Sequence, residues 1–124
     1  IIPALKNEEI LIYGDGEQIM DMIYVGDLSQ VLINSLVLEH NNWNSIIEAG
    51  SGNETTVNEI CELVLKITKS SSTISYISMR GGEPKNAVVL GDPKTMLPIG
   101  INKNQLLSLE EGIQKTVNFY KKNI

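Results

Sequence analysis

Arg80 is the side chain best suited to binding chemistry. It is the single arginine of the chain and stands in the glycine-rich stretch R-G-G-E-P at residues 80–84. A guanidinium group can bind a phosphate through two parallel hydrogen bonds, and flanking glycines let a ligand approach the backbone. A loop arginine is more often only solvated, so this stretch by itself indicates a phosphate contact without establishing one.

The residues that could carry other chemistry have plainer interpretations. His40 is the one histidine and lies beside a polar stretch, so we expect it at the surface end of a helix, and a Ser/His/Asp triad has no further support. Cys61 falls on the apolar face of a predicted helix and is expected in the core. The chain has no His, Cys and carboxylate cluster at metal-ligand spacing. We therefore predict no catalytic residue and no metal site in this chain.

Two glycine pairs could suggest a phosphate-binding loop. Residues 14–16 read G-D-G and residues 50–52 read G-S-G, but neither continues into G-x-G-x-x-G. We predict that both are turns in which glycine takes a positive φ.

The elements that must position these residues alternate between strand and helix. Short β-like runs occur at residues 10–13, 22–25, 46–49 and 74–77, and residues 1–9 resemble the end of a helix. Capping boxes predict three helix starts, at Asp27 with Gln30, Thr56 with Glu59, and Ser108 with Glu111. Asp92 followed by a proline predicts another. We predict a mixed α/β fold with short strands and three or four helices.

Apolar residues recur at helical spacing behind two of these caps. One face carries Val57, Ile60, Cys61, Val64 and Leu65, and the last helix carries Leu109, Ile113, Val117 and Tyr120. Three serines at residues 70–72 should end the first of these helices.

Length and composition narrow the class of protein. The 124 residues suffice for a single domain, and a net charge of −5 argues against a nucleic-acid partner. No apolar run is long enough to span a membrane, and no signal peptide is present. A lone cysteine suits the reducing cytoplasm. The chain begins without methionine, so we expect it to be a piece of a longer protein.

Several segments, taken together, resemble the extended short-chain dehydrogenase/reductase family, the NAD-dependent sugar epimerases and dehydratases. The family forms are K-A-L-x-G-x-P-L-x-I-Y-G, G-D-G-x-Q-x-R-D-F-x-Y-V-D-D, Y-N-I-G-S-G-x-x-x-S-V, R-P-G-E and a closing A-D-x-x-K…L-E-E-G-L-x-x-T-x-x-W-Y. Their counterparts here are residues 4–14, 14–28, 47–57, 80–83 and 92–120. They occur in the family's order and cover nearly the whole chain.

The resemblance implies that residues 1–124 are one C-terminal, substrate-binding domain. Leu11 and Tyr13 would lie near the nucleotide base, Arg80 would contact the diphosphate, and Glu83 would hold the loop. Residues 46–49 would be the strand that completes the family's sheet. Leaving that strand edge unpaired predicts that the isolated chain is marginally stable or self-associates as a homo-oligomer.

The cofactor is implied for the full-length protein alone. The family binds NAD or NADP through G-x-x-G-x-x-G and uses a Tyr-x-x-x-Lys pair, and neither motif occurs here. We therefore expect this chain alone to bind no cofactor and to be inactive.

Two positions depart from the family pattern. Met20 replaces the arginine that grips the diphosphate, and Glu48 replaces an asparagine near a phosphate. Together these changes should weaken diphosphate binding by several kcal/mol, given about 1.5–3 kcal/mol for each charge-assisted bond. Three hypotheses follow: a nucleotide-sugar epimerase or dehydratase, an enzyme of the same fold on a non-nucleotide substrate, and a non-catalytic binding domain.

Overall fold

The computed structural model describes residues 1–37 and 45–124, so His40 and the polar stretch at 41–44 lie outside the described residues. The elements in order are α1 (Ile2–Lys6), β1 (Ile10–Tyr13), β2 (Ile19–Met20), α2 (Val25–Val37), β3 (Thr55–Thr56), α3 (Val57–Thr68), β4 (Ile74–Ile77), β5 (Val88–Val89), the 3-10 helices η1 (Pro93–Ile99) and η2 (Lys103–Gln105), and α4 (Leu109–Asn123). The prediction of a mixed α/β fold with three or four α-helices is confirmed.

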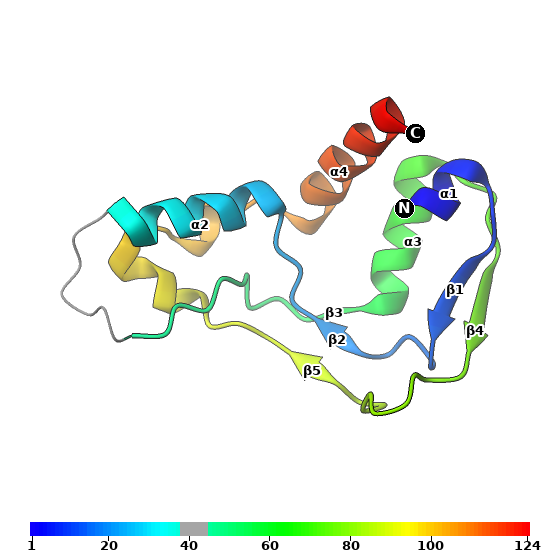
Figure 1. Ribbon diagram of the computed structural model, residues 1–124, viewed down its shortest axis with the longest axis horizontal. Coiled ribbons are helices and arrows are strands. Elements are labelled where there is room, and N and C mark those ends of the chain that lie inside the picture. Colours follow the sequence, from blue (N-terminus) through cyan, green and yellow to red (C-terminus); the bar gives the residue numbers. More distant parts are fainter. Residues whose placement is uncertain (38–44) are drawn as a thin grey trace.

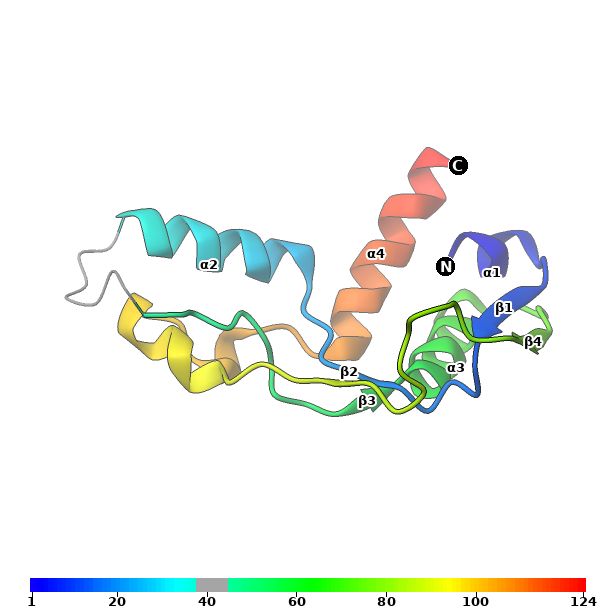
Figure 2. The same cartoon turned by 60° about the horizontal axis from the view of Figure 1, so that its bottom comes forward.

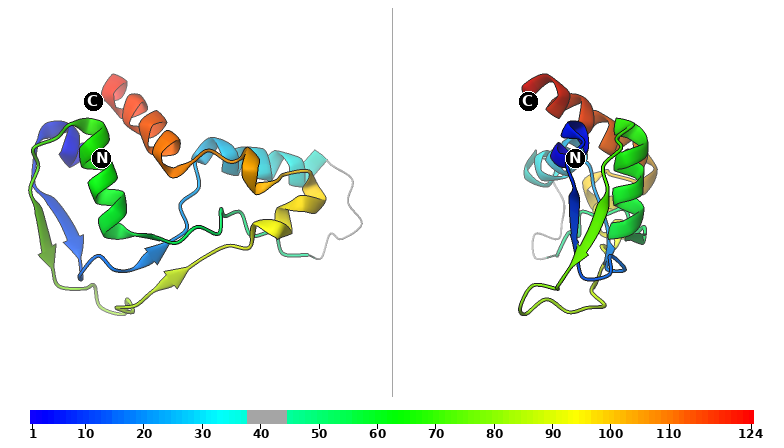
Figure 3. Two further views of the ribbon diagram at one scale, coloured as in Figure 1. Left: turned by 180° about the vertical axis from the view of Figure 1, so that it is seen from behind. Right: turned by 90° about the vertical axis from the view of Figure 1, so that its right-hand side faces the viewer.

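One end of the molecule is built on the parallel pair β1–β4. Ile10 lies opposite Ile74, and Tyr13 lies opposite Ile77. Helices α1, α3 and α4 gather at the same end, where both chain termini also lie (Figures 1 and 3). Their core is made of Ala4, Val64, Ile113 and Val117.

The other end packs α2 against η1. Its buried core consists of Val31, Met96, Ile99 and Ile101, with Ile47 and Ala49 packed against it. Asn34 ties the two helices by donating from Nδ2 to the Ile99 carbonyl over 2.9 Å. Each end therefore has its own small apolar core.

A small sheet lies between these two ends. β2 is its middle strand, antiparallel to β3 and parallel to β5 (Figure 2). Thr56, at the end of β3, also caps α3: its Oγ1 accepts from the Glu59 amide, and the Glu59 carboxylate accepts from the Thr56 amide. This predicted capping box and the one at Ser108 are both confirmed.

Asp21, directly after β2, joins three chain segments. Its Oδ1 accepts from the amide and hydroxyl of Ser51 at 2.9 and 2.7 Å. Its Oδ2 accepts from the amides of Gly52 and Gly91 at 2.7 and 3.1 Å. A Cβ at Gly50 would collide with this carboxylate and lie 3.1 Å from the Gly91 Cα. Gly50 therefore lets Asp21 and Gly91 approach its backbone closely, whereas the positive φ predicted for this turn is found at Gly52.

The same hydrogen bonds set the charge state of Asp21. Partial burial by itself raises the pKa of the carboxyl, but the bonds from Ser51, Gly52 and Gly91 outweigh it and leave the pKa below its ordinary value. Asp21 is therefore ionised at neutral pH.

One strand prediction is wrong. Residues 22–25 form no strand: the ladder lies three residues earlier, in β2, and Val25 already begins α2. Residues 46–49 alternate in exposure as a strand would, and no other described segment pairs with them. That they complete a sheet with another part of the protein stays a prediction. Asp27 is not the cap of α2; it lies in the first turn, and its Oδ2 accepts from the Leu107 amide at 2.8 Å.

Among the described residues, no helix is both long and apolar enough to cross a membrane. One face of α2 nevertheless exposes apolar side chains to solvent: more than half of the surface is exposed at each of Val25, Leu32, Ile33 and Leu36.

The Asp21 junction predicts a measurable loss of stability on Asp21→Asn. An asparagine places an amide N–H group against backbone N–H donors, so we expect the free energy of unfolding to fall by about 2 kcal/mol. Urea unfolding of the intact protein measures this change. Asp15→Asn is the control, because Asp15 is exposed and the one bond that its carboxylate accepts among the described residues comes from the nearby Glu17 amide.

The difference should also depend on pH. Because the folded pKa of Asp21 is lowered, its contribution is present above the ordinary value of 3.8 and is lost as the pH falls through the folded value. The difference in the free energy of unfolding between wild type and Asp21→Asn should therefore become smaller below that pH. A gap that stays constant down to acid unfolding would contradict this account.

Candidate ligand-binding cleft

The candidate site lies where β1 and β4 end. The two strands are parallel and their last residues, Tyr13 and Ile77, are partners. The Gly14 amide continues the ladder by donating to the Ile77 carbonyl over 2.8 Å. Because carboxyl ends of parallel strands meet at one edge, the loops that follow them lie side by side, and ligand sites often form there.

Arg80 folds back over Tyr13. Its guanidinium carbon is 4.0 Å from the centre of the Tyr13 ring, a cation–π contact. Its Nη1 donates to Glu83 Oε1 over 3.4 Å, and both side chains stay about half exposed or more. Contact with Tyr13, followed by the charge of Glu83, raises the pKa of Arg80. The guanidinium is thus charged, oriented by two neighbours and open to solvent.

Leu11, Tyr13 and Arg80, predicted as substrate contacts, all line one cleft of about 370 Å³. Arg80 and Glu83 are its charged members. The other lining residues are neutral and mostly apolar: Leu11, Ile12, Tyr13, Gln18, Met20, Val57, Met79, Pro84, Ala87 and Val89. The cleft therefore offers one positive group, with the Glu83 carboxylate beside it, in a wall that is otherwise uncharged and mostly apolar.

Gln18 is a cleft residue that the sequence interpretation did not single out. It is 8% exposed, and its Nε2 donates to the Tyr13 carbonyl at 3.3 Å and to Met79 Sδ at 3.5 Å. Its position at the glutamine of the G-D-G-x-Q motif was the available signal, but a sequence does not show that the side chain turns inward.

Met20 lies in the cleft, as its place in the family motif predicts. It is 37% exposed and pairs with Val89, another lining residue. Glu48 is not among the lining residues. Its carboxylate accepts from the Asp92 amide at 2.8 Å, where η1 begins. The predicted repulsion between Glu48 and a bound phosphate therefore finds no support in this cleft, whereas the change at Met20 does affect it.

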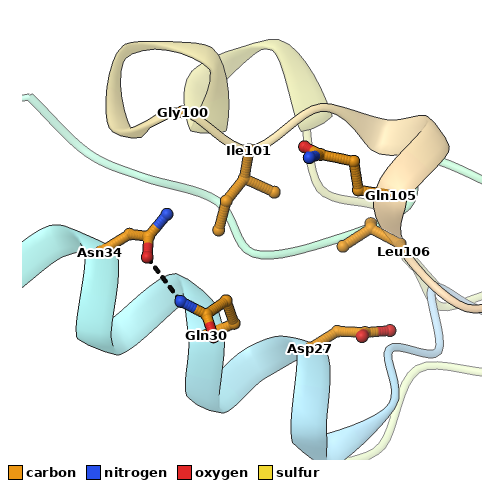
Figure 4. Close-up of a pocket in the computed structure, with 7 residues that line it drawn as sticks. All are labelled: Asp27, Gln30, Asn34, Gly100, Ile101, Gln105 and Leu106. Carbon is orange, nitrogen blue, oxygen red and sulfur yellow. Dashed lines mark hydrogen bonds between the residues drawn. The ribbon is translucent and has the colours of Figure 1, made fainter.

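A second cleft of about 270 Å³ lies between α2 and η2 (Figure 4). Its polar groups bind one another or the backbone: Gln30 Nε2 donates to Asn34 Oδ1 over 2.6 Å, and Gln105 Oε1 accepts from the Asn102 amide at 2.7 Å. Two other bonds hold α2 to this region: Asn34 Nδ2 donates to the Ile99 carbonyl, and the Leu107 amide donates to Asp27 Oδ2. This second cleft is better explained by packing than by ligand chemistry.

A third cavity, of about 350 Å³, is lined mainly by apolar side chains of α3, α4 and residues 22–25. None of the described residues that line it has a charged side chain, and it has the character of a packing surface. Cys61 is buried, as predicted, and burial raises the pKa of its thiol, which disfavours the reactive thiolate. Within residues 1–37 and 45–124, no three His, Cys, Asp or Glu side chains gather as a metal site.

Comparison with known proteins finds relatives over the full chain. The chain is 33% identical over 120 residues to a putative UDP-glucose 4-epimerase of Methanocaldococcus jannaschii, and the match covers 96% of this chain and 36% of that protein. Among solved structures, UDP-glucose 4-epimerase from Thermotoga maritima, with UDP-glucose, has a TM-score of 0.83 at 30% identity, covering 98% of this chain and 37% of the other. No family model matches.

UDP-glucuronic acid 4-epimerase from Bacillus cereus, solved with UDP-glucuronic acid and NAD, has the same fold, with a TM-score of 0.82 at 22% identity. The chain spans about a third of the length of the relatives it matches. Over that length it is similar to NAD-dependent nucleotide-sugar epimerases and dehydratases, proteins of the extended short-chain dehydrogenase/reductase family, which confirms the predicted resemblance.

The wall of the cleft depends on a glycine at residue 14. Gly14 has φ +77°, and a Cβ there would lie 2.5 Å from Met79 Cε and 2.9 Å from Gln18 Nε2. Gly14→Ala should lower the free energy of unfolding by roughly 1–2 kcal/mol from backbone strain alone. Gly81→Ala is the matched control, because that site has open space and no positive φ. Equal urea-unfolding curves for the two variants would contradict the predicted role of Gly14.

Proposed function

We propose that this chain supplies the nucleotide-binding wall of an NAD-dependent nucleotide-sugar epimerase or dehydratase. The observation that carries the proposal is the convergence of Leu11, Tyr13 and Arg80 on one cleft. The relatives act on UDP-sugars by name, and the structure of one of them contains UDP-glucose. Leu11 and Tyr13 would border the base, and Arg80 would bind the diphosphate.

Arg80 is suited to this role because its guanidinium is fixed in orientation while most of its hydrogen-bond donors stay available. Stacking on Tyr13 fixes the plane of the guanidinium, and the contact to Glu83 uses one nitrogen. The remaining N–H groups are free to bind a phosphate oxygen. The diphosphate of a nucleotide sugar, which carries two negative charges in total, would also outcompete the single carboxylate of Glu83.

NAD or NADP would be held elsewhere in the protein. The chain contains neither the glycine-rich dinucleotide motif nor a Tyr-x-x-x-Lys pair, so its residues do not fit that cofactor. We propose that residues 1–124 are the substrate-binding domain and that the exposed apolar face of α2 packs against the cofactor-binding part. Burying that face would remove an apolar surface that is costly to leave in water.

Met20 favours a second candidate, an enzyme of the same fold acting on a substrate without a diphosphate. A thioether in place of a guanidinium leaves the cleft with one positive side chain balanced by Glu83. Such a wall suits a neutral or singly charged ligand better than a dianion.

Binding of UDP-glucose to the intact protein, measured by calorimetry, tests the first proposal. Arg80→Gln should raise the Kd by about tenfold, as expected for one partly screened charge-assisted contact. Lys85→Gln is the control, since it removes the same charge from an exposed position that does not line the cleft. If the wild-type protein bound no UDP-, dTDP- or GDP-sugar, the nucleotide-sugar assignment would be excluded.

Met20→Arg separates the two candidates. A second guanidinium in the cleft should lower the Kd for UDP-glucose by about tenfold if a diphosphate lies beside Met20. Val88→Arg is the control: it adds the same charge on the neighbouring exposed strand position, whose side chain alternates away from Val89 and the cleft. An unchanged Kd in Met20→Arg would place the phosphates elsewhere.

A further inference from the structure

Gln18 leaves one polar atom unused at the wall of the cleft. Gln18 is buried, with 8% of its surface exposed, and its Oε1 has no hydrogen-bond partner among the described residues. It is the one buried side-chain oxygen or nitrogen in that part of the chain with this property. Buried acceptors are nearly always paired, so an unpaired one that lines a cleft calls for an explanation.

The orientation of the amide follows from its neighbours. Nε2 donates to the Tyr13 carbonyl, which can only accept, so turning the amide over would place two acceptors against each other. The Gln18 carbonyl accepts from the Val57 amide at 3.2 Å, which fixes the backbone. Gly14 leaves the space in which Nε2 lies. Oε1 is therefore the free end of a side chain that is fixed on every other side.

We infer that Gln18 Oε1 binds a hydrogen-bond donor of the nucleoside part of the ligand. The inference rests on the proposed function and extends it, because Arg80 recognises negative charge while Gln18 recognises an N–H or O–H group. The uracil N3–H and the ribose hydroxyls are the donors that a uridine nucleotide carries. Met20 and Met79 line the same cleft, and their flexible side chains can re-pack to admit the donor.

In this arrangement Arg80 and Gln18 contact different parts of the ligand. Arg80 is solvent-exposed and holds the anionic end of the ligand, and Gln18 is buried and accepts from its neutral end. Discrimination at a buried, unpaired acceptor is strong, because a ligand without the donor leaves the acceptor unsatisfied. Gln18 is thus a specificity-determining residue for the nucleoside.

Calorimetric titration of the intact protein with UDP tests this inference. Gln18→Met keeps the length of the side chain and removes the acceptor, so the Kd for UDP should rise roughly five- to tenfold. Three analogues identify the donor: N3-methyl-UDP lacks the uracil N3–H, and 2′-deoxy-UDP and 3′-deoxy-UDP each lack one ribose hydroxyl. One of these should bind wild type more weakly than UDP does and bind Gln18→Met as well as UDP does.

The controls separate recognition from stability. Val117→Ala removes buried volume in α4, away from the cleft, and should lower stability without changing the Kd. An unchanged UDP affinity in Gln18→Met, or analogue ratios that are the same in wild type and variant, would overturn the role of Gln18 alone. Failure of wild type to bind UDP would overturn the proposed function and this inference with it.

Discussion

The Asp21 carboxylate is the interaction on which the arrangement of the chain depends. It accepts four hydrogen bonds from Ser51, Gly52 and Gly91, which are 30 to 70 residues away in sequence. Bonds to an ionised acceptor are stronger than neutral ones, so a single side chain can hold three extended segments together. The junction lies directly after Met20, so it also sets where that wall of the cleft runs. The helices that carry the two small cores lie on either side of β2, the strand that Asp21 directly follows (Figure 1).

The cleft follows from topology more than from any one residue. Parallel pairing of β1 and β4 brings Tyr13 beside the loop that carries Arg80, and the turn after β1 returns the chain as β2. The result is a wall with one accessible cation, a nearby carboxylate and a buried amide. With so little charge, this wall offers a ligand mainly its shape and hydrogen-bonding groups that are already oriented.

The extent of exposed apolar surface fits a chain that matches a third of its relatives' length. The two cores are small, and large apolar side chains remain open on α2 and along β5. A helix whose apolar stripe faces water gains stability only when another surface covers it. The cleft and the apolar face of α2 therefore share one property: both are surfaces that the described residues leave uncovered.

The sequence by itself determined the features that depend on near neighbours, and the tertiary structure decided those that depend on distant ones. The capping boxes at Thr56 and Ser108 were predictable because cap and partner are three residues apart. The convergence of Leu11, Tyr13 and Arg80 on one cleft could be expected because motif order carries topology. The role of Asp27 was not, since its partner, Leu107, is 80 residues away. The unpaired oxygen of Gln18 was not predictable either, because burial and the direction of an amide arise only when remote segments pack around it.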